Sequence, residues 1–320
     1  MKRRQFIKST TAFTAATALS SQLISANKSI SMMKDRKFKL CLNPGIIGVN
    51  ANLQETLDYA IKYGYESIIS MPNEMMEYSA SQMDELKSKM TENNIGWGST
   101  NIPVEYRLDK AKFDADFKGL EKFAKTMQKA GATRMNTWII STHNELTYNE
   151  NMKQHAYRLG ECAKVMKDYG IRLGLEYLGM RTMMSGGRYP FIGSMKEGKE
   201  LIAEIGESNV GFVLDTFHWY CANDNGDDIR TLKPEDIITV DINDARAGFE
   251  RIDQVDLKRE LPLATGVINI KEFLQALIDI GYDGPLRTEP FNKVLNDLDN
   301  DTALKVNMDS IKKALALVEM

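Results

Sequence analysis

The feature that most limits the fold of this chain is a regular alternation of strand-like and helix-like segments over residues 38–318. Short apolar or β-branched runs predict strands, and a segment with helical periodicity follows each of them. Eight strands are expected, at 38–42, 65–70, 95–102, 133–140, 172–177, 210–214, 237–242 and 285–288. Alternating strands and helices favour a parallel sheet. Eight such units favour an α/β fold in which the sheet closes into a single (β/α)8 TIM barrel.

The intervening helices carry recognisable end signals. They are expected at 53–63, 81–93, 109–130, 151–169, 194–205, 227–232, 270–280 and 301–318. Several are followed by glycine, the residue that most often ends a helix, among them those before Gly64, Gly131, Gly170 and Gly281. A doubly wound open sheet is the alternative fold. It would normally carry a glycine-rich phosphate-binding turn after the first strand, and Asn43-Pro44-Gly45 is not such a turn.

The first thirty residues are expected to be a leader. Arg3 and Arg4 form a twin-arginine signature, and an uncharged run rich in Ala, Thr, Ser and Leu extends from Ser9 to about Ala26. That run is too short and too polar to span a bilayer stably, so no membrane insertion is expected after cleavage. We therefore predict a twin-arginine signal peptide at 1–30, a barrel domain at 36–320 and a periplasmic or otherwise exported location. A disordered basic N-terminus is the alternative.

Four of the predicted strands end in a carboxylate. Glu176, Asp215, Asp241 and Glu289 stand at or just after the ends of predicted strands five to eight. Successive acids are 39, 26 and 48 residues apart, which fits one βα unit per step if the last unit has an extended loop over 246–266. Because the carboxyl ends of parallel strands meet at one face of a barrel, the four acids are expected to converge in one cleft.

Carboxylates gathered in this way would repel one another, and some would stay protonated unless a cation lay between them. Ligand sets made only of oxygen favour magnesium or manganese over zinc. The sequence therefore predicts one divalent metal ion, Mn²⁺ or Mg²⁺, held by Glu176, Asp215, Asp241 and Glu289. The alternative is that some of these acids are ordinary turn residues or helix caps.

Composition narrows the function classes. The formal net charge of −3 gives no basic footprint, so a nucleic-acid partner is not expected. Three histidines are too few for a His-rich metal centre. The three widely spaced cysteines make neither a disulfide framework nor a zinc motif. The sequence leaves open whether the chain forms a homo-oligomer.

The chain resembles the xylose isomerase-like TIM-barrel family of sugar isomerases and epimerases over residues 38–318. The most specific matches are Leu214-Asp215-Thr216-Phe217-His218, Asn243-Asp244-Ala245, Gly281-Tyr282-Asp283-Gly284-Pro285 and Glu289-Pro290-Phe291. In the ketose 3-epimerase branch, Glu, Asp, His and Glu from strands five to eight hold the metal. The resemblance places these roles on the same four acids. Asp241 departs from the pattern, which has His there, and this change should favour Mn²⁺ or Mg²⁺ further.

The resemblance implies an isomerase or epimerase that acts on a free sugar or keto-sugar, a small-molecule carbohydrate, through an enediolate. Glu176 and Glu289 would be the catalytic base and acid as well as metal ligands. His218 would contact the substrate. Arg246 lies near, but not in register with, the family's substrate-binding arginine. Trp219 is a candidate to wall the pocket, whereas Trp97 and Trp138 are expected to be packing residues.

Two other functions remain open. A metal-dependent lyase or dehydratase could perform β-elimination on a 3-keto-sugar or 3-keto-glycoside, because the same enediolate can expel a leaving group instead of taking back a proton. A non-catalytic exported sugar-binding barrel would bind sugar without needing the metal. The sequence does not identify the sugar.

Overall fold

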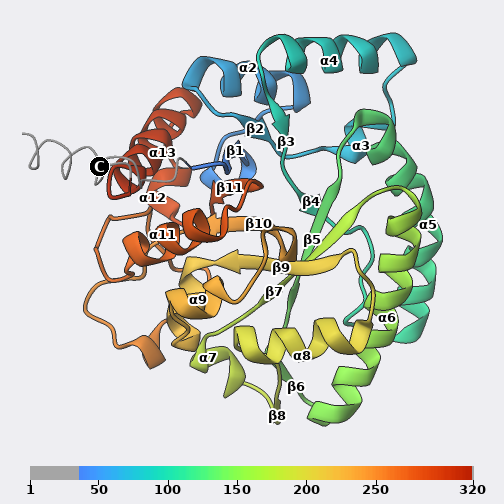
Figure 1. Ribbon diagram of the computed structural model, residues 1–320, viewed down its shortest axis with the longest axis vertical. Helices are drawn as coiled ribbons and strands as arrows, with labels where there is room; N and C mark the ends of the chain where they lie inside the picture. Colours follow the sequence, from blue (N-terminus) through green and yellow to red (C-terminus); the bar gives the residue numbers. More distant parts are fainter. Residues whose placement is uncertain (1–35, 319–320) are drawn as a thin grey trace, which may run out of the picture. The chain divides into compact units, whose positions relative to one another are not determined.

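The computed structural model describes residues 36–318, whose strands form a parallel sheet curled into a barrel (Figure 1). The spatial order of its nine strands is β3 (Gly96–Trp97), β2 (Ser67–Ile68), β1 (Lys39–Leu42), β11 (Pro285–Thr288), β10 (Ile237–Ile242), β9 (Val210–Asp215), β7 (Arg172–Tyr177), β5 (Arg134–Ile139) and β4 (Thr100–Asn101). The predicted α/β barrel is confirmed. The predicted leader at 1–30 lies outside the described residues.

Nine strands appear where eight were expected because the third predicted strand is broken. Its halves, β3 and β4, pair with β2 and β5 respectively. Only Gly98 and Ser99 separate them, so this break joins the two edges of the sheet. A Cβ atom on Gly98 would lie 2.4 Å from the Cys41 Sγ, which explains why glycine occupies the break.

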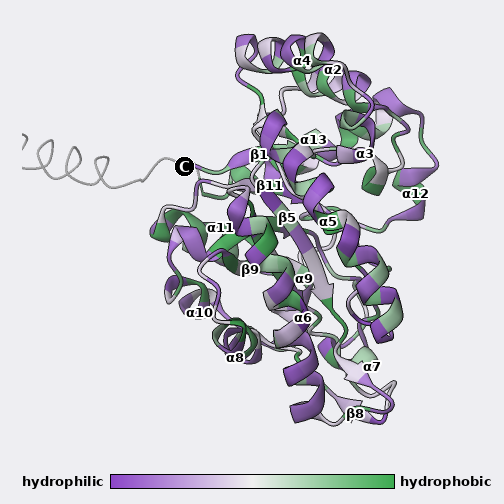
Figure 2. Ribbon diagram, turned by 90° about the vertical axis from the view of Figure 1, so that its right-hand side faces the viewer, coloured by the Kyte–Doolittle hydropathy of each residue, from purple (hydrophilic) through white to green (hydrophobic). Residues whose placement is uncertain are grey.

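A ring of helices surrounds the sheet (Figure 1). The longer ones are α2 (Leu53–Tyr63), α4 (Ala80–Glu92), α5 (Lys110–Ala130), α6 (Tyr148–Asp168), α8 (Met195–Ile205), α11 (Ile270–Ile280) and α13 (Asn300–Leu315). Figure 2 shows hydrophilic and hydrophobic residues side by side on these helices, as expected when one face packs on the sheet. Side-chain caps begin several of them, such as Asn52 before α2 and Asp109 before α5.

Short elements occupy the connections. They are α3 (Pro72–Met75), α7 (Arg181–Met184), α9 (Thr216–Ala222), α10 (Gly226–Arg230) and α12 (Lys293–Asn296), with 3₁₀ turns at Gly45–Ile47, Pro234–Asp236 and Arg251–Asp253. An unpredicted antiparallel pair, β6 (Thr142–His143) with β8 (Tyr189–Pro190), links the loops that follow β5 and β7. Apart from Pro234–Asp236, which directly precedes β10, these elements lie in segments that follow the carboxyl ends of strands, where barrel enzymes carry their sites.

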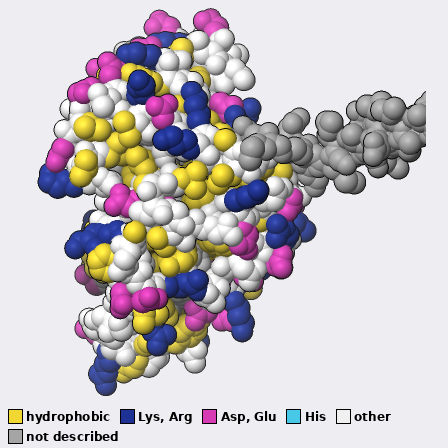
Figure 3. All heavy atoms as spheres, turned by 90° about the vertical axis from the view of Figure 1, so that its left-hand side faces the viewer, with side chains coloured by type: hydrophobic (Ala, Val, Ile, Leu, Met, Phe, Trp, Pro, Cys, Tyr) yellow, Lys and Arg dark blue, Asp and Glu magenta, His cyan; other side chains and the backbone are white. Residues whose placement is uncertain are grey.

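The central strands are buried, and the surface carries a mixture of charges. Strands β9 and β10 are buried along their whole length, as expected for strands enclosed between helices and a packed interior. Basic and acidic side chains are interspersed over the face shown in Figure 3, without a basic stripe. Within residues 36–318, no helix combines the length and the apolar character needed to cross a membrane.

Candidate metal centre

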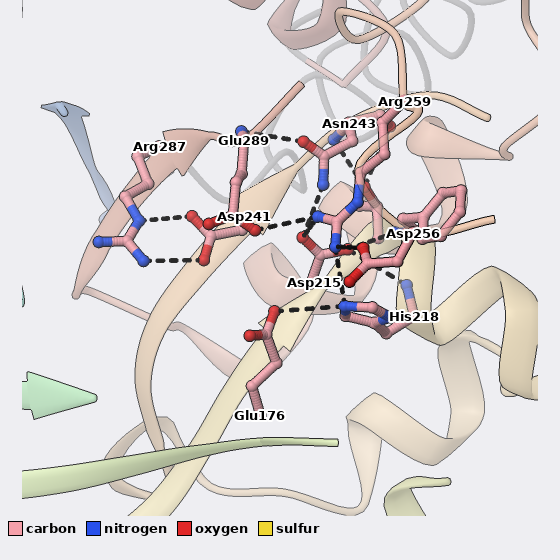
Figure 4. A network of polar contacts seen from close by, with 11 residues as sticks. Glu176, Asp215, His218, Asp241, Asn243, Asp256, Arg259, Arg287 and Glu289 are labelled. Carbon is pink, nitrogen blue, oxygen red and sulfur yellow. Dashed lines mark hydrogen bonds and ion pairs between the residues drawn. The ribbon is translucent and has the colours of Figure 1, made fainter. Parts of the chain in front are cut away.

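The four predicted acids meet at the carboxyl end of the sheet (Figure 4). Glu176 is the last but one residue of β7, Asp215 ends β9, Asp241 is the last but one residue of β10, and Glu289 directly follows β11. One oxygen from each lies within 4.8 Å of the others. Their side chains are 13%, 0%, 1% and 17% exposed, respectively. The structure thus brings together all four acids in one buried cluster.

Two buried arginines balance part of this charge. Arg287 donates from Nε to the Asp241 Oδ1 at 2.5 Å and from Nη2 to the Oδ2 at 3.1 Å. Arg259, from the loop after β10, donates from Nη1 to the Asp215 Oδ2 at 2.8 Å and to the Glu289 Oε2 at 3.0 Å. The two arginines therefore supply two positive charges against the four acids, and Arg259 shares its charge with Asp256 as well.

His218 is held neutral by Arg259. The Arg259 Nη2 donates to the Asp256 Oδ1 at 2.8 Å and faces the His218 Nε2 at 2.9 Å. Because a guanidinium has no acceptor, the Nε2 must accept, which places the imidazole proton on Nδ1. Burial and the charge of Arg259 lower the pKa of His218 well below its ordinary value. The same Nε2 lies 3.7 Å from the Glu176 Oε1.

Asp215 is the most constrained of the acids. Its Oδ1 accepts from the backbone N–H groups of Phe217 at 2.6 Å and His218 at 3.1 Å, which caps α9. Its Oδ2 accepts from the Asn243 Nδ2 at 2.6 Å and from Arg259. All four lone pairs are used. Asp215 can therefore bind a metal only where Arg259 or another donor releases it.

Burial and crowding make full ionisation of the cluster costly. Burial, reinforced by the charges of Glu289 and Asp215, raises the pKa of Glu176 well above its ordinary value. Burial and the charge of Asp241 raise the pKa of Glu289 to about 8. Burial also raises the pKa of Asp215 to about 6, although Arg259 opposes the shift. A further cation would let these groups ionise together at neutral pH.

The donor set fits a divalent ion. All four candidate ligands supply oxygen, the donor that Mg²⁺ and Mn²⁺ prefer, and the two arginines leave at least two of the four negative charges unmatched. The Glu176 Oε1 is buried without a hydrogen-bond partner among the residues that the structure describes. A second possible ligand set has one nitrogen. It consists of Glu176, Asp215 and His218, whose ligand atoms also lie within 4.8 Å of one another.

A cavity of about 560 Å³ opens beside the cluster, within the usual size for a small-molecule site. Glu176, Glu289 and the two arginines are among the residues that line it. Neutral polar side chains line it as well. There the Ser99 Oγ donates to the Asn136 Oδ1 and the Asn136 Nδ2 donates to the Asn101 Oδ1, both at 2.8 Å. Acidic and hydroxyl-binding groups therefore share one space.

Of the three residues predicted to contact substrate, one lines the cavity and two do not. His218 lines the cavity, but Arg246 and Trp219 are not among the described residues that do so. The Arg246 guanidinium lies 3.9 Å from the ring centre of Phe249. Trp219 is 3% exposed and packs on Phe273, which lies on α11. The indole of Trp219, which was expected to wall the pocket, is therefore buried between α9 and α11 instead.

Three cavity residues were missed or misjudged from the sequence. Trp138 was expected to be a packing residue, but it lines the cavity and is 38% exposed. Trp97, by contrast, is half-buried and donates a hydrogen bond to the Ala130 carbonyl, as a packing residue would. Arg287 had a readable signal, because strand alternation puts it on the same face as Glu289. Arg259 had none, since it lies in a loop without periodicity.

The raised pKa values predict how the metal-free protein responds to pH. A carboxyl with a higher pKa in the folded chain binds more protons when folded, so the free energy of unfolding falls as pH rises. The free energy of unfolding is lost between pH 3.8 and about pH 6 for Asp215, and between pH 4.5 and about pH 8 for Glu289, because these are the ordinary and the raised pKa values of the two groups. We expect the midpoint of thermal unfolding in EDTA to fall by more than about 5 °C between pH 5 and pH 8.

With saturating Mn²⁺ the same scan should be much flatter, because the ion favours the ionised carboxylates over that range. Differential scanning fluorimetry in the two buffers makes the comparison. A fall of the same size in both buffers would argue against the metal site, whereas a flat profile in EDTA would argue against the titration.

Comparison with known proteins agrees with this geometry. The model of the family described as xylose isomerase-like TIM barrel matches residues 57–314. An inosose isomerase from Halalkalibacterium halodurans is 26% identical over 281 residues, which are 85% of this chain and 94% of that protein. A D-psicose 3-epimerase from Ruminiclostridium cellulolyticum is 24% identical over 253 residues, 75% of this chain and 79% of that protein.

Among solved structures, the IolI protein with a bound zinc atom has a similar fold, with a TM-score of 0.72. It is 21% identical, and the match covers 87% of this chain and 98% of that one.

Proposed function

The chain belongs to the xylose isomerase-like TIM barrel family, and from that premise we propose that it is a divalent-metal-dependent isomerase or epimerase of a free sugar or keto-sugar. The observation that carries the proposal is the convergence of four strand-end carboxylates beside a polar cavity of small-molecule size. Relatives named as an inosose isomerase and a D-psicose 3-epimerase support the reaction class.

We assign the metal to Glu176, Asp215, Asp241 and Glu289. Mn²⁺ or Mg²⁺ suits this set best, because every donor is a carboxylate oxygen. When bound, the ion would act as a Lewis acid that polarises a substrate carbonyl and stabilises the charge of an enediolate.

Proton transfer falls to Glu176 and Glu289. They reach the cluster from β7 and β11, which are separated by β9 and β10, so they can address a substrate from two sides (Figure 4). An ionised carboxylate next to the substrate can take a proton from carbon, and the resulting acid can return it. His218, held neutral, and Arg259 are placed to orient substrate oxygens, and Arg259 takes the role that the resemblance suggested for Arg246.

The cavity favours an unphosphorylated substrate. Of its two buried cations, Arg287 is held by both oxygens of Asp241, and Arg259 is surrounded by carboxylates that would repel a phosphate. The linked side chains of Ser99, Asn136 and Asn101 supply neutral donors and acceptors suited to sugar hydroxyls.

Solvent exchange tests the proposal. The metal-loaded protein would be incubated in heavy water with Mn²⁺ and a panel of sugars and keto-sugars, with an EDTA-treated sample as control. We expect metal-dependent deuterium incorporation at a carbon next to a carbonyl, and a product with the same formula as its substrate. Loss of water or an alcohol would identify the lyase instead. Sugar binding without any exchange would identify a non-catalytic barrel.

We also propose that the protein is exported through the twin-arginine pathway, on the strength of Arg3 and Arg4 ahead of an uncharged run. Replacing both by lysine should retain the protein in the cytoplasm, as measured by cell fractionation. The matched control replaces Lys2 and Lys8 by arginine, which keeps both the charge and the pair. Unchanged export of the double-lysine protein would contradict the assignment.

A further inference from the structure

Asp241 and Arg287 form a single unit on neighbouring strands. They are direct partners in the parallel register of β10 and β11, so both side chains point to the same face. The guanidinium meets both carboxylate oxygens at 2.5 and 3.1 Å. The side chains are 1% and 7% exposed, respectively. A two-point contact between two rigid strands, shielded from water, is a fixed feature of the site.

This contact leaves Asp241 able to bind a metal. Each carboxylate oxygen has two lone pairs, and Arg287 uses one on each. The contacts of Arg259 are different, because its one Nη1 is shared between Asp215 and Glu289 and its backbone belongs to a loop. To leave Asp241, Arg287 would have to give up both bonds of a buried two-point contact, whereas Arg259 holds Asp215 and Glu289 through one shared nitrogen. Arg287 therefore stays beside Asp241 whether or not a metal is bound.

Resting on the proposed function, we propose that Arg287 is a built-in counter-charge that limits the affinity of the metal site. It converts Asp241 from a charged ligand into a nearly neutral donor. The charge of the ligand set and the rigidity of a site set the affinity of proteins for hard divalent cations. With Arg287 in place, the ion meets three uncompensated acids at most. The pair thereby lowers the affinity of the site for its ion, so that the ion stays able to bind substrate oxygens.

If Arg287 has this role, removing it and removing the charge of Asp241 should change the dissociation constant for Mn²⁺ in opposite directions, and the two changes should cancel when combined. Arg287→Met frees the full charge of Asp241, so the dissociation constant for Mn²⁺ should fall at least about 10-fold. Asp241→Asn removes the charge but leaves Arg287 facing the ion, so the dissociation constant should rise at least about 10-fold. The double variant keeps a neutral donor and no cation, and it should return to within a few-fold of the wild type.

Isothermal titration with Mn²⁺ alone, without substrate, measures these constants. Arg287→Lys keeps the charge without the two-point contact, and it should bind with nearly wild-type affinity if charge is what matters. Arg36 with Glu66 is the matched control, since it is also a two-point pair but joins residues before β1 and β2, at the opposite ends of the strands. Arg36→Met should leave Mn²⁺ affinity unchanged.

The outcomes separate this inference from the proposed function. No Mn²⁺ binding by the wild type would refute the metal-dependent function itself. Binding by the wild type, with affinity unchanged or lowered in Arg287→Met, would overturn only the role of Arg287. Should Arg287→Met not fold, Asp241→Asn against the double variant measures the same contribution, with at least about 10-fold tighter binding expected in the double variant.

Discussion

An Asp215→Ala protein should lose tight binding of Mn²⁺, with a dissociation constant raised by more than about 10²-fold. Loss of a group that only supports a ligand already costs about 10- to 100-fold in affinity, and Asp215 is a proposed ligand at the centre of the cluster. The change also strips a partner from Arg259 and Asn243 and removes the side-chain cap of α9. Isothermal titration, with bound metal measured after dialysis, makes the test.

Asp256 provides the matched control. It is an acid that contacts the same Arg259 at 2.8 Å, yet it is not one of the four acids of the cluster. Asp256→Asn should keep Mn²⁺ affinity within a few-fold of the wild type. Circular dichroism would check that the Asp215→Ala protein is folded, since losing the cap alone costs about 1 kcal/mol. A folded variant that still binds one equivalent of Mn²⁺ tightly would remove Asp215 from the ligand set.

Regular elements of this fold could be predicted well because their residues repeat with a fixed period. The strands at 172–177, 237–242 and 285–288 and the helices at 53–63 and 270–280 have the predicted bounds. The errors lie where local contacts override the period. Contact between Gly98 and Cys41 accompanies the break in one strand, and the carboxylate of Asp215 starts the unpredicted helix α9 directly after β9.

The site was predictable to the extent that strands position it. Acids at the ends of parallel strands must come close, whatever the loops do, and the four carboxylates meet as expected. Arg259 was not predictable, because its position depends on a loop in which Leu257 and Leu263 adopt positive φ values of 59° and 63°. Neither residue favours that conformation, so the sequence carries no sign of it. Which indole faces the cavity was decided by packing, which a single sequence does not reveal.

At saturating Mn²⁺, a Glu289→Gln protein should still hold its metal while kcat falls by at least about 10², the scale of general acid–base catalysis. Glutamine keeps the size of the side chain and one oxygen, which can still accept from the Arg259 Nη1 that now lies 3.0 Å from the Glu289 Oε2. It cannot take a proton from carbon. Deuterium exchange into the substrate, measured beside Mn²⁺ binding by the same preparation, separates lost chemistry from lost metal.

Glu176→Gln is the companion variant, because the proposal gives the two acids reciprocal roles. Both variants should be slow in exchange and both should keep the metal, whereas damage to the ligand set would lower metal content and exchange together. Near-normal exchange by Glu289→Gln would move the base to Glu176 alone. His218 is the poorer candidate, because its Nε2 faces the Arg259 Nη2 at 2.9 Å and must lose that donor before it can accept a proton from the substrate.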